Sequence, residues 1–364
     1  MRNLFDTVMR NHIKRRRFIA AAGVASFGAI AGCIGEEAVD DEDPAGDDDP
    51  TDDDENGMDD DDDDDEEFDE DEFEDAEPEE GGEVIVWHAG GTGGTYFPLS
   101  GEFKSIVEAN TPHGLQVQST GASVANVGSL EREEADFALI QNDIAYFAYN
   151  GTALEEFEGA PVETLRGVAT LYPETIHIIT QADSGIESVE DLEGQTINTG
   201  DLGSGTQVNA LQILESAGID DFDEENTDFS TAADQIRDGD IDAAFIVGGA
   251  PVGAVEELAT TEDIALVEVS GDLREQIQAD AEWMADDTVE GGTYEGVDDD
   301  VETVSVQAMI ATHEGVDDDI VEEITEAIFE NAGDLTIESE AITADTAQDG
   351  MPIDLHPGAE AYFG

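Results

Sequence analysis

The sequence has few positively charged residues and a single cysteine. Lysine and arginine total 11 against 94 aspartates and glutamates, which gives a formal net charge of −83. Five of those basic residues lie in residues 83–364, a segment with 62 acidic residues and a net charge of −57. Proteins neutralise nucleic-acid phosphates with lysine and arginine, so this balance argues against nucleic-acid binding. Concentrated salt must screen such a charge for the fold to stay compact, so the composition predicts a halophilic source.

Catalytic and nucleotide-binding motifs are equally scarce. Ser204 lacks the GxSxG context of a nucleophile, HExxH is missing, and with two lysines the chain has no Walker A motif. The histidines between residues 83 and 364 each stand alone, which favours packed or surface positions over a metal site: His88, His113, His177, His313 and His356. We therefore expect that the protein is not an enzyme and uses no metal or cofactor.

The N-terminus contains the pattern of an export signal. Lys14–Arg17 precede an apolar run, Phe18–Ile30, that is too short to span a bilayer as a helix. Paired arginines followed by Phe18-Ile19 resemble a twin-arginine signal, and Ile30-Ala31-Gly32-Cys33 resembles a lipobox. The sequence thus predicts a twin-arginine lipoprotein signal over residues 1–32 and lipidation of Cys33. We expect an extracytoplasmic, cell-surface lipoprotein that is anchored to the cell membrane.

An acidic segment follows the predicted signal. Between Glu36 and Gly82 the chain has 31 acidic residues and no lysine or arginine. Self-repulsion and the shortage of core-forming residues predict disorder here. Residues 33–82 are therefore predicted to form a flexible tether behind the lipidated cysteine.

The rest of the chain shows an α/β pattern. Short β-branched runs predict strands at Val84–Trp87, Leu115–Gln118, Phe137–Ile140, Thr196–Ile197 and Ile241–Val247. Helical stretches alternate with them, most clearly at Thr206–Ala217 and Val316–Phe329. This alternation indicates mostly parallel sheets, whose ligand sites lie beyond the carboxyl ends of the strands. A body of about 280 residues exceeds one typical core and suggests two lobes.

Two longer β-prone runs, Thr175–Thr180 and Thr303–Ile310, bracket the middle of this body. As connections they would carry the chain from one lobe to the other and back, with a cleft between the lobes and a hinge at these runs. As ordinary core strands they would belong to a single sheet. We expect the first arrangement, with residues 83–174 and 303–364 in lobe 1 and residues 175–302 in lobe 2.

Three loops rich in glycine and hydroxyl residues each precede a predicted helix. They are Gly90–Pro98, Thr120–Ser123 and Gly203–Gln207. Such helix starts can point backbone N–H groups at an anionic or carbonyl group. Helix capping alone would also explain Ser, Thr and Gly at these places. The three loops together favour a binding role.

These segments, in this order, resemble the TAXI family, the extracytoplasmic solute receptors of tripartite ATP-independent periplasmic (TRAP) transporters. The resemblance rests on eight segments that span nearly the whole body: GGTGGTYFP (90–98), TGASVANV (120–127), DFALIQND (136–143), RGVATLYPE (166–174), DLEGQTINTGDLGSGTQ (191–207), DGDIDAAFIVGGAP (238–251), GTYEGVDDDVETVSV (292–306) and IDLHPGAEAYF (353–363).

The resemblance implies a two-lobed fold of the type II periplasmic-binding-protein class. Its lobes would close on a small organic anion, glutamate-like or a dicarboxylate, and deliver it to an ion-coupled TRAP permease. An exported sensor that binds the same ligand and reports to a signalling partner stays open as the alternative.

The resemblance also implies a ligand site, carried over residue by residue from the matching loops. Its residues are Thr92, Gly93, Gly94, Thr95, Tyr96, Thr120, Gly121, Ala122, Ser123, Gln141, Asn142, Asp143, Tyr172, Ser204, Gly205, Thr206, Gln207, Gly249, Ala250 and Pro251. These loops contain no equivalent of the arginine that commonly clamps the substrate carboxylate in related DctP-type receptors. We therefore expect helix-start N–H groups and Ser and Thr hydroxyls to hold a ligand carboxylate, with Tyr96 and Tyr172 covering its apolar stem.

Overall fold

A computed structural model of the protein describes residues 78–364. The predicted signal, Cys33 and nearly all of the predicted tether lie outside the described residues. Within this range, no helix combines the length and the apolar character needed to cross a membrane.

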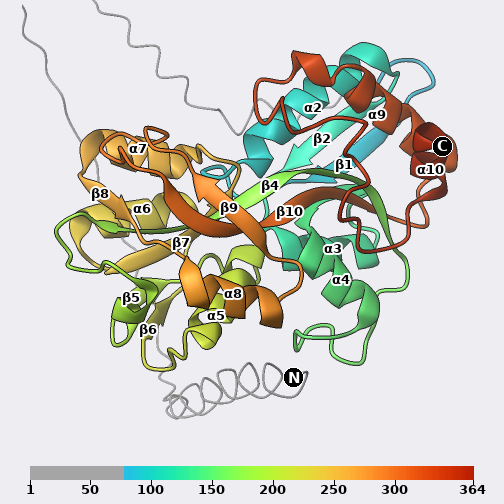
Figure 1. The fold of residues 1–364 in the computed structure, drawn as a ribbon. Helices are drawn as coiled ribbons and strands as arrows, with labels where there is room; N and C mark the ends of the chain where they lie inside the picture. Colours follow the sequence, from blue (N-terminus) through green and yellow to red (C-terminus); the bar gives the residue numbers. More distant parts are fainter. Residues whose placement is uncertain (1–77) are drawn as a thin grey trace, which may run out of the picture.

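Ten strands form one sheet with the order β2-β1-β3-β10-β4-β7-β5-β6, while β8 pairs with β4 and β9 pairs with β10. Their bounds are β1 Val84–His88, β2 Gly114–Gln118, β3 Phe137–Gln141, β4 Leu165–Gln181, β5 Thr196–Asn198, β6 Asp223–Glu225, β7 Ala243–Gly248, β8 Ile264–Leu266, β9 Ala285–Val289 and β10 Val301–His313. In Figure 1, β4 and β10 run across the middle of the molecule and connect its two lobes.

The two lobes repeat one strand order. In lobe 1, β1 pairs parallel with β2 and β3, and β3 pairs antiparallel with β10. In lobe 2, β5 pairs parallel with β6 and β7, and β7 pairs antiparallel with β4. The fourth strand of each lobe thus arrives from the other lobe. This two-lobed α/β arrangement is the type II periplasmic-binding-protein fold that the sequence led us to expect.

Helices cover both faces of the sheet in each lobe (Figure 1). They are α2 Tyr96–Asn110, α3 Ser123–Glu131, α4 Asn142–Asn150, α5 Gly205–Ser216, α6 Phe229–Asp238, α7 Gly253–Thr261, α8 Gly271–Asp280, α9 Asp318–Glu330 and α10 Pro357–Phe363, with 3₁₀ turns η2 Val189–Leu192 and η3 Ala332–Asp334. In lobe 1, one core lies under α2 and α9 and another under α3 and α4. In lobe 2, one core lies under α5 and α8 and another under α6 and α7.

The long strands mark where the chain passes between these cores. Along β4, Tyr172 packs in a lobe 1 core and Ile176 in a lobe 2 core. Along β10, Val306 packs in lobe 2 and Ala308 in lobe 1. Both runs that we expected to connect the lobes lie within these strands. Each strand is longer than its run, because the sheet pairing continues into both lobes.

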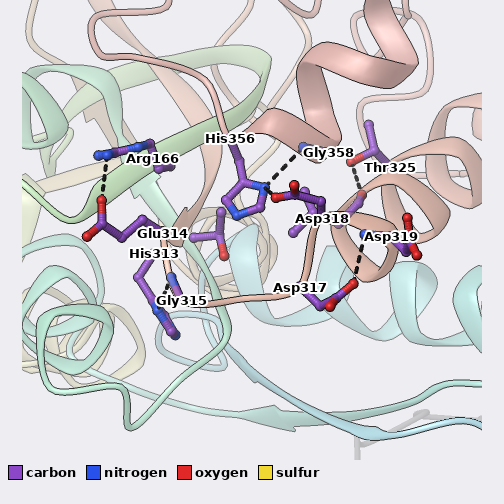
Figure 2. A network of polar contacts seen from close by, with 12 residues as sticks. Arg166, His313, Glu314, Gly315, Asp317, Asp318, Asp319, Thr325, His356 and Gly358 are labelled. Atoms are coloured by element: carbon purple, nitrogen blue, oxygen red, sulfur yellow. Dashed lines mark hydrogen bonds and ion pairs between the residues drawn. The ribbon is translucent and has the colours of Figure 1, made fainter.

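The C-terminal segment docks back onto lobe 1, as Figure 2 shows. The backbone N–H of His356 donates to the carbonyl of Gly167 in β4 at 2.9 Å. Its imidazole Nδ1 accepts from the N–H of Gly358 at 3.2 Å and so caps α10. Burial lowers the pKa of this fully buried histidine. His356 is therefore a packed structural residue, as expected for an isolated histidine.

Candidate functional site

A cavity lies between the two lobes and measures about 60 Å³. Lobe 1 contributes the starts of α2 and α3, the end of β3 and one residue of β4. Lobe 2 contributes the start of α5, the start of α6 with the residue before it, and one residue of β7. Because about 10–15 Å³ suffices for one water, this space holds roughly four to six waters or a small organic ligand.

Twelve of the twenty predicted ligand residues line this cavity. They are Gly93, Gly94, Thr95, Tyr96, Thr120, Gly121, Ala122, Ser123, Gln141, Ser204, Gly205 and Thr206. All three glycine- and hydroxyl-rich loops thus meet at one place, although they come from different lobes. The other eight predicted residues do not line the cavity: Thr92, Asn142, Asp143, Tyr172, Gln207, Gly249, Ala250 and Pro251.

Asn142 and Asp143 serve packing around the cavity instead. The side-chain oxygen of Asn142 accepts from the backbone N–H of Gln307 in β10 at 3.1 Å. The carboxyl group of Asp143 is fully buried and accepts from the side-chain amide of Asn209 in α5 at 2.9 Å. This bond joins α4 of lobe 1 to α5 of lobe 2. Burial raises the pKa of Asp143 to about 7.

The other residues outside the lining also have local roles. Gln207 accepts from the N–H of Gly203 at 3.0 Å and so closes the loop before α5. The carbonyl of Gly249 accepts from the Thr95 hydroxyl at 3.3 Å, and a cis peptide bond follows between Ala250 and Pro251. Thr92 is exposed and Tyr172 is fully buried.

Capping accounts for only one of the three helix starts. The Ser204 hydroxyl accepts from the N–H of Gln207 at 3.1 Å and caps α5. The helices α2 and α3 start after Thr95 and Ala122, and neither residue makes a side-chain capping bond. Ala122 has φ 61° and ψ −145°, a conformation that glycine tolerates and that costs other residues about 1–3 kcal/mol. Such strain at a cavity wall favours a binding role for this loop.

Two buried polar atoms at the cavity have no hydrogen-bond partner within the described residues. They are the hydroxyl of Tyr96 and Oε1 of Gln141, whose side chains belong to residues that are 6% and 3% exposed. An unpaired buried polar group costs about 1–3 kcal/mol. A bound ligand that supplied these partners would recover that free energy.

The carboxyl group of Glu174 is the main feature that the sequence did not reveal. Glu174 lies in β4, lines the cavity and is 3% exposed. Burial raises its pKa to about 8, although the neighbouring side chains of Gln141 and Tyr96 partly oppose that rise. A carboxyl residue inside an otherwise apolar β run is the signal that could have identified it. The other lining residues outside our predicted set are Gly90, Gly91, Asp201, Asp228, Phe229 and Val247.

No lysine, arginine or histidine lines the cavity. All five basic residues of the body form ion pairs elsewhere, and Figure 2 shows one of them, Arg166 with Glu314. The other pairs are Lys104–Glu108, Arg132–Glu134, Arg237–Asp234 and Arg274–Asp286. Across residues 78–364, no group of three or more His, Cys, Asp or Glu side chains is placed to hold a metal ion.

A model of the NMT1-like family matches residues 88–364, which include the whole cavity lining. The chain belongs to the NMT1-like family. This NMT1-like protein is also similar to three solved structures of low identity. One is an ancestral arginine-binding protein bound to arginine (14% identity, 71% of this chain and 96% of that chain, TM-score 0.45).

The second is a putative L-cystine ABC transporter from Listeria monocytogenes (13%, 73% and 98%, TM-score 0.44). The third is XAC2383 from Xanthomonas citri bound to ATP (10%, 77% and 94%, TM-score 0.43). Likenesses at this level say nothing of which ligand the NMT1-like protein binds.

Proposed function

We propose that this NMT1-like protein is an extracytoplasmic solute receptor that captures a small organic solute carrying a carboxylate. The cavity between the lobes carries this proposal. Helix starts from both lobes meet there, and the Tyr96 hydroxyl and the Gln141 carbonyl oxygen lack partners inside it. Backbone N–H groups at helix starts are suited to hold a carboxylate where cations are missing.

We further propose that the receptor is of the TAXI type and delivers its solute to a TRAP permease. The ordered sequence segments support this finer assignment. In the same proposal, lipid on Cys33 and the acidic tether keep the receptor near its membrane partner and so raise its effective concentration there. The lobes would comprise residues 83–174 with 303–364 and residues 175–302. Loss of solute uptake on deletion of the gene would support transport, whereas unchanged uptake would favour the sensor.

Ligand binding can be tested by thermal unfolding of the full chain in concentrated salt with a panel of amino acids and dicarboxylates. A ligand at a 100-fold excess over its Kd should stabilise the protein by about 2.7 kcal/mol. Thr206→Leu should abolish that gain, because Thr206 lines the cavity and is 5% exposed. Ser204 is left intact since it caps α5.

Thr260→Leu is the matched control. Thr260 is an exposed residue of α7 and does not line the cavity. This variant should keep the full ligand-induced gain. If Thr206→Leu kept it as well, the cavity would not be the binding site. If no compound of the panel stabilised the wild-type protein, the receptor proposal would fail for these solute classes.

A further inference from the structure

Hydrogen-bond acceptors from both lobes line the cavity. Glu174 and Gln141 come from adjoining parts of lobe 1, and Oε1 of Gln141 has no partner within the described residues. Asp201 and Asp228 add two carboxyl groups from lobe 2. No cation lines the cavity to offset them. A ligand with negative charge alone would meet three carboxyl groups there.

Donors gather at the helix starts. The first turns of α2 and α3 have no side-chain cap, and the hydroxyls of Ser123 and Thr206 lie at the cavity wall. A carboxylate is the group that such helix starts stabilise. An ammonium group has three N–H donors and a positive charge, which match the acceptors in the cavity. An α-amino acid carries both groups on one carbon atom.

We propose that Glu174 makes this cavity selective for ligands that carry an ammonium group, α-amino acids above all, over oxo acids of the same shape. The inference rests on the proposed receptor function and assigns its solute class. Glu174 would be the counter-ion of the ammonium group, and Gln141 would accept one of its N–H bonds.

The protonation state of Glu174 gives the proposal a measurable consequence, the release of a proton on binding. In the empty cavity its pKa of about 8 keeps most Glu174 carboxyl groups protonated at pH 7. Tyr96, Asp143 and Glu338 are the titratable groups that act on it, and none of them carries a positive charge. Glu174 in turn raises the pKa of Tyr172. An ammonium group favours the carboxylate, so its binding lowers this pKa and releases a proton. An anionic ligand disfavours the carboxylate and releases none.

Calorimetry on the full chain in concentrated salt at pH 7 tests the selectivity with matched pairs. Each pair differs in an ammonium or an oxo group on one carbon: L-glutamate and 2-oxoglutarate, L-alanine and pyruvate, L-leucine and 4-methyl-2-oxopentanoate. In the pair that binds, we expect the amino acid to bind at least 30-fold more tightly than its oxo acid. A buried charged group left without its partner costs about 2 kcal/mol or more. An oxo acid that binds as tightly as its amino acid overturns the proposal but leaves the receptor function standing. Failure of every pair to bind contradicts both.

Proton exchange is measured by repeating the titration in buffers of different ionisation enthalpy. Wild-type protein should release a proton when it binds the amino acid, and Glu174→Gln should release none and lose at least 30-fold in affinity. Proton uptake by the wild type, or unchanged affinity in Glu174→Gln, would show that a protonated Glu174 donates to an anion instead, and would overturn the proposal. The number of protons that the wild type releases on binding tests the proposal even if Glu174→Gln fails to fold.

Glu338→Gln is the matched control. Burial also raises the pKa of Glu338, to about 7, and this group acts on Glu174 without lining the cavity. We expect this variant to keep the preference for the amino acid and to keep releasing a proton. Loss of the preference in Glu338→Gln but not in Glu174→Gln would contradict the role given to Glu174.

Discussion

At the scale of single residues, the buried carboxyl groups behave differently from those of the acidic surface. Asp143 is fully buried and receives N–H bonds from Ile144 at 2.8 Å and from the side chain of Asn209 at 2.9 Å. The side-chain oxygen of Asn209 has no partner within the described residues. The bonds from Ile144 and Asn209 favour the carboxylate and lower the pKa of Asp143, but burial outweighs them and raises it to about 7.

This predicts how Asp143→Asn changes the pH dependence of stability. The pKa of Asp143 is raised from 3.8 to about 7 by folding. Its stabilising contribution is therefore fully present below about pH 4 and is lost as the pH rises to about 7. Asparagine is neutral at every pH but has one side-chain oxygen where Asp143 accepts with two, so the variant should be less stable than the wild type near pH 4. Above pH 7 it should be more stable by on the order of 2 kcal/mol.

Urea unfolding at pH 4 and pH 8 measures this difference. Asp220→Asn removes an exposed carboxyl group and is the matched control. It should change the free energy of unfolding little at either pH. An effect of Asp143→Asn that is the same at both pH values would exclude titration of Asp143 as the cause.

At the scale of elements, the cavity depends on how closely β3 and α5 approach. The carboxamide of Gln141, at the end of β3, contacts Gly205 at the start of α5 so closely that a Cβ there would overlap it. The absence of a side chain at Gly205 thus lets the two lobes meet at the cavity. The starts of α2, α3, α5 and α6, the end of β3 and single residues of β4 and β7 together define the space for the ligand.

Gly205→Ala should weaken ligand binding. The added methyl group would displace Gln141, and overpacking of this kind costs about 1–3 kcal/mol. We expect at least fivefold lower affinity by calorimetry. The free energy of unfolding should fall as well, but by less than this cost, because alanine favours helix over glycine. Gly333→Ala, in the 3₁₀ turn η3 with open space around the new methyl group, is the control and should bind normally. Wild-type affinity in Gly205→Ala would mean that the ligand-bound lobes do not need this contact.

The same scale shows what could be predicted from the sequence. The strand runs at Val84, Leu115 and Phe137 and the loops that follow them were identifiable because apolar periodicity and small residues are local signals. The strands β6 and β9 were not identified, because Asp223–Glu225 and most of Ala285–Val289 are acidic or small and carry no apolar alternation. The helix Val316–Phe329 was placed slightly early, since Asp317 caps α9 and the helix begins at Asp318.

The cavity shows the limit of such reasoning. Loops that would meet there were recognisable, but Glu174 could not be told apart from the other acidic residues by type alone. Its place within a β-prone run was a local signal, but the burial of its carboxyl group between the lobes depends on the fold. Asp143 was predicted as a ligand contact from the family resemblance, and the start of α4 turns its side chain toward α5. The direction of a side chain depends on packing that the sequence pattern does not contain.

At the scale of the whole molecule, acidic charge is left almost uncompensated. Residues 83–364 carry a net charge of −57, and their five basic residues are already paired. The ion pairs that are well exposed contribute little. Self-repulsion across the surface therefore opposes the folded state, and its size depends on how far each charge acts through the solvent. The halophilic source stays a prediction, and the dependence of folding stability on salt concentration tests it.

Salt should stabilise the fold, and a charge reversal on α9 should show that screening is the reason. Glu326 is exposed and lies one turn from Glu322, Glu323 and Glu330. Glu326→Lys replaces three repulsive neighbours by attractive ones, each worth about 0.2–0.5 kcal/mol. In 0.1 M KCl, where the Debye length is about 10 Å, the variant should exceed the wild type by about 1–3 kcal/mol, since each neighbour changes from repulsive to attractive. In 1 M KCl, where that length is about 3 Å, the gain should shrink while the urea midpoint of both proteins rises.

Glu326→Gln removes the charge without reversing it and should give about half of that gain in low salt. A wild-type midpoint that does not rise with KCl would contradict the halophilic prediction. A gain in Glu326→Lys that stays the same in 1 M KCl would point to helix propensity or side-chain packing rather than charge. If the gain does fade, the acidic surface opposes folding through repulsion that concentrated salt screens, whereas the carboxyl group of Glu174, a residue that is 3% exposed, is shielded from salt by burial.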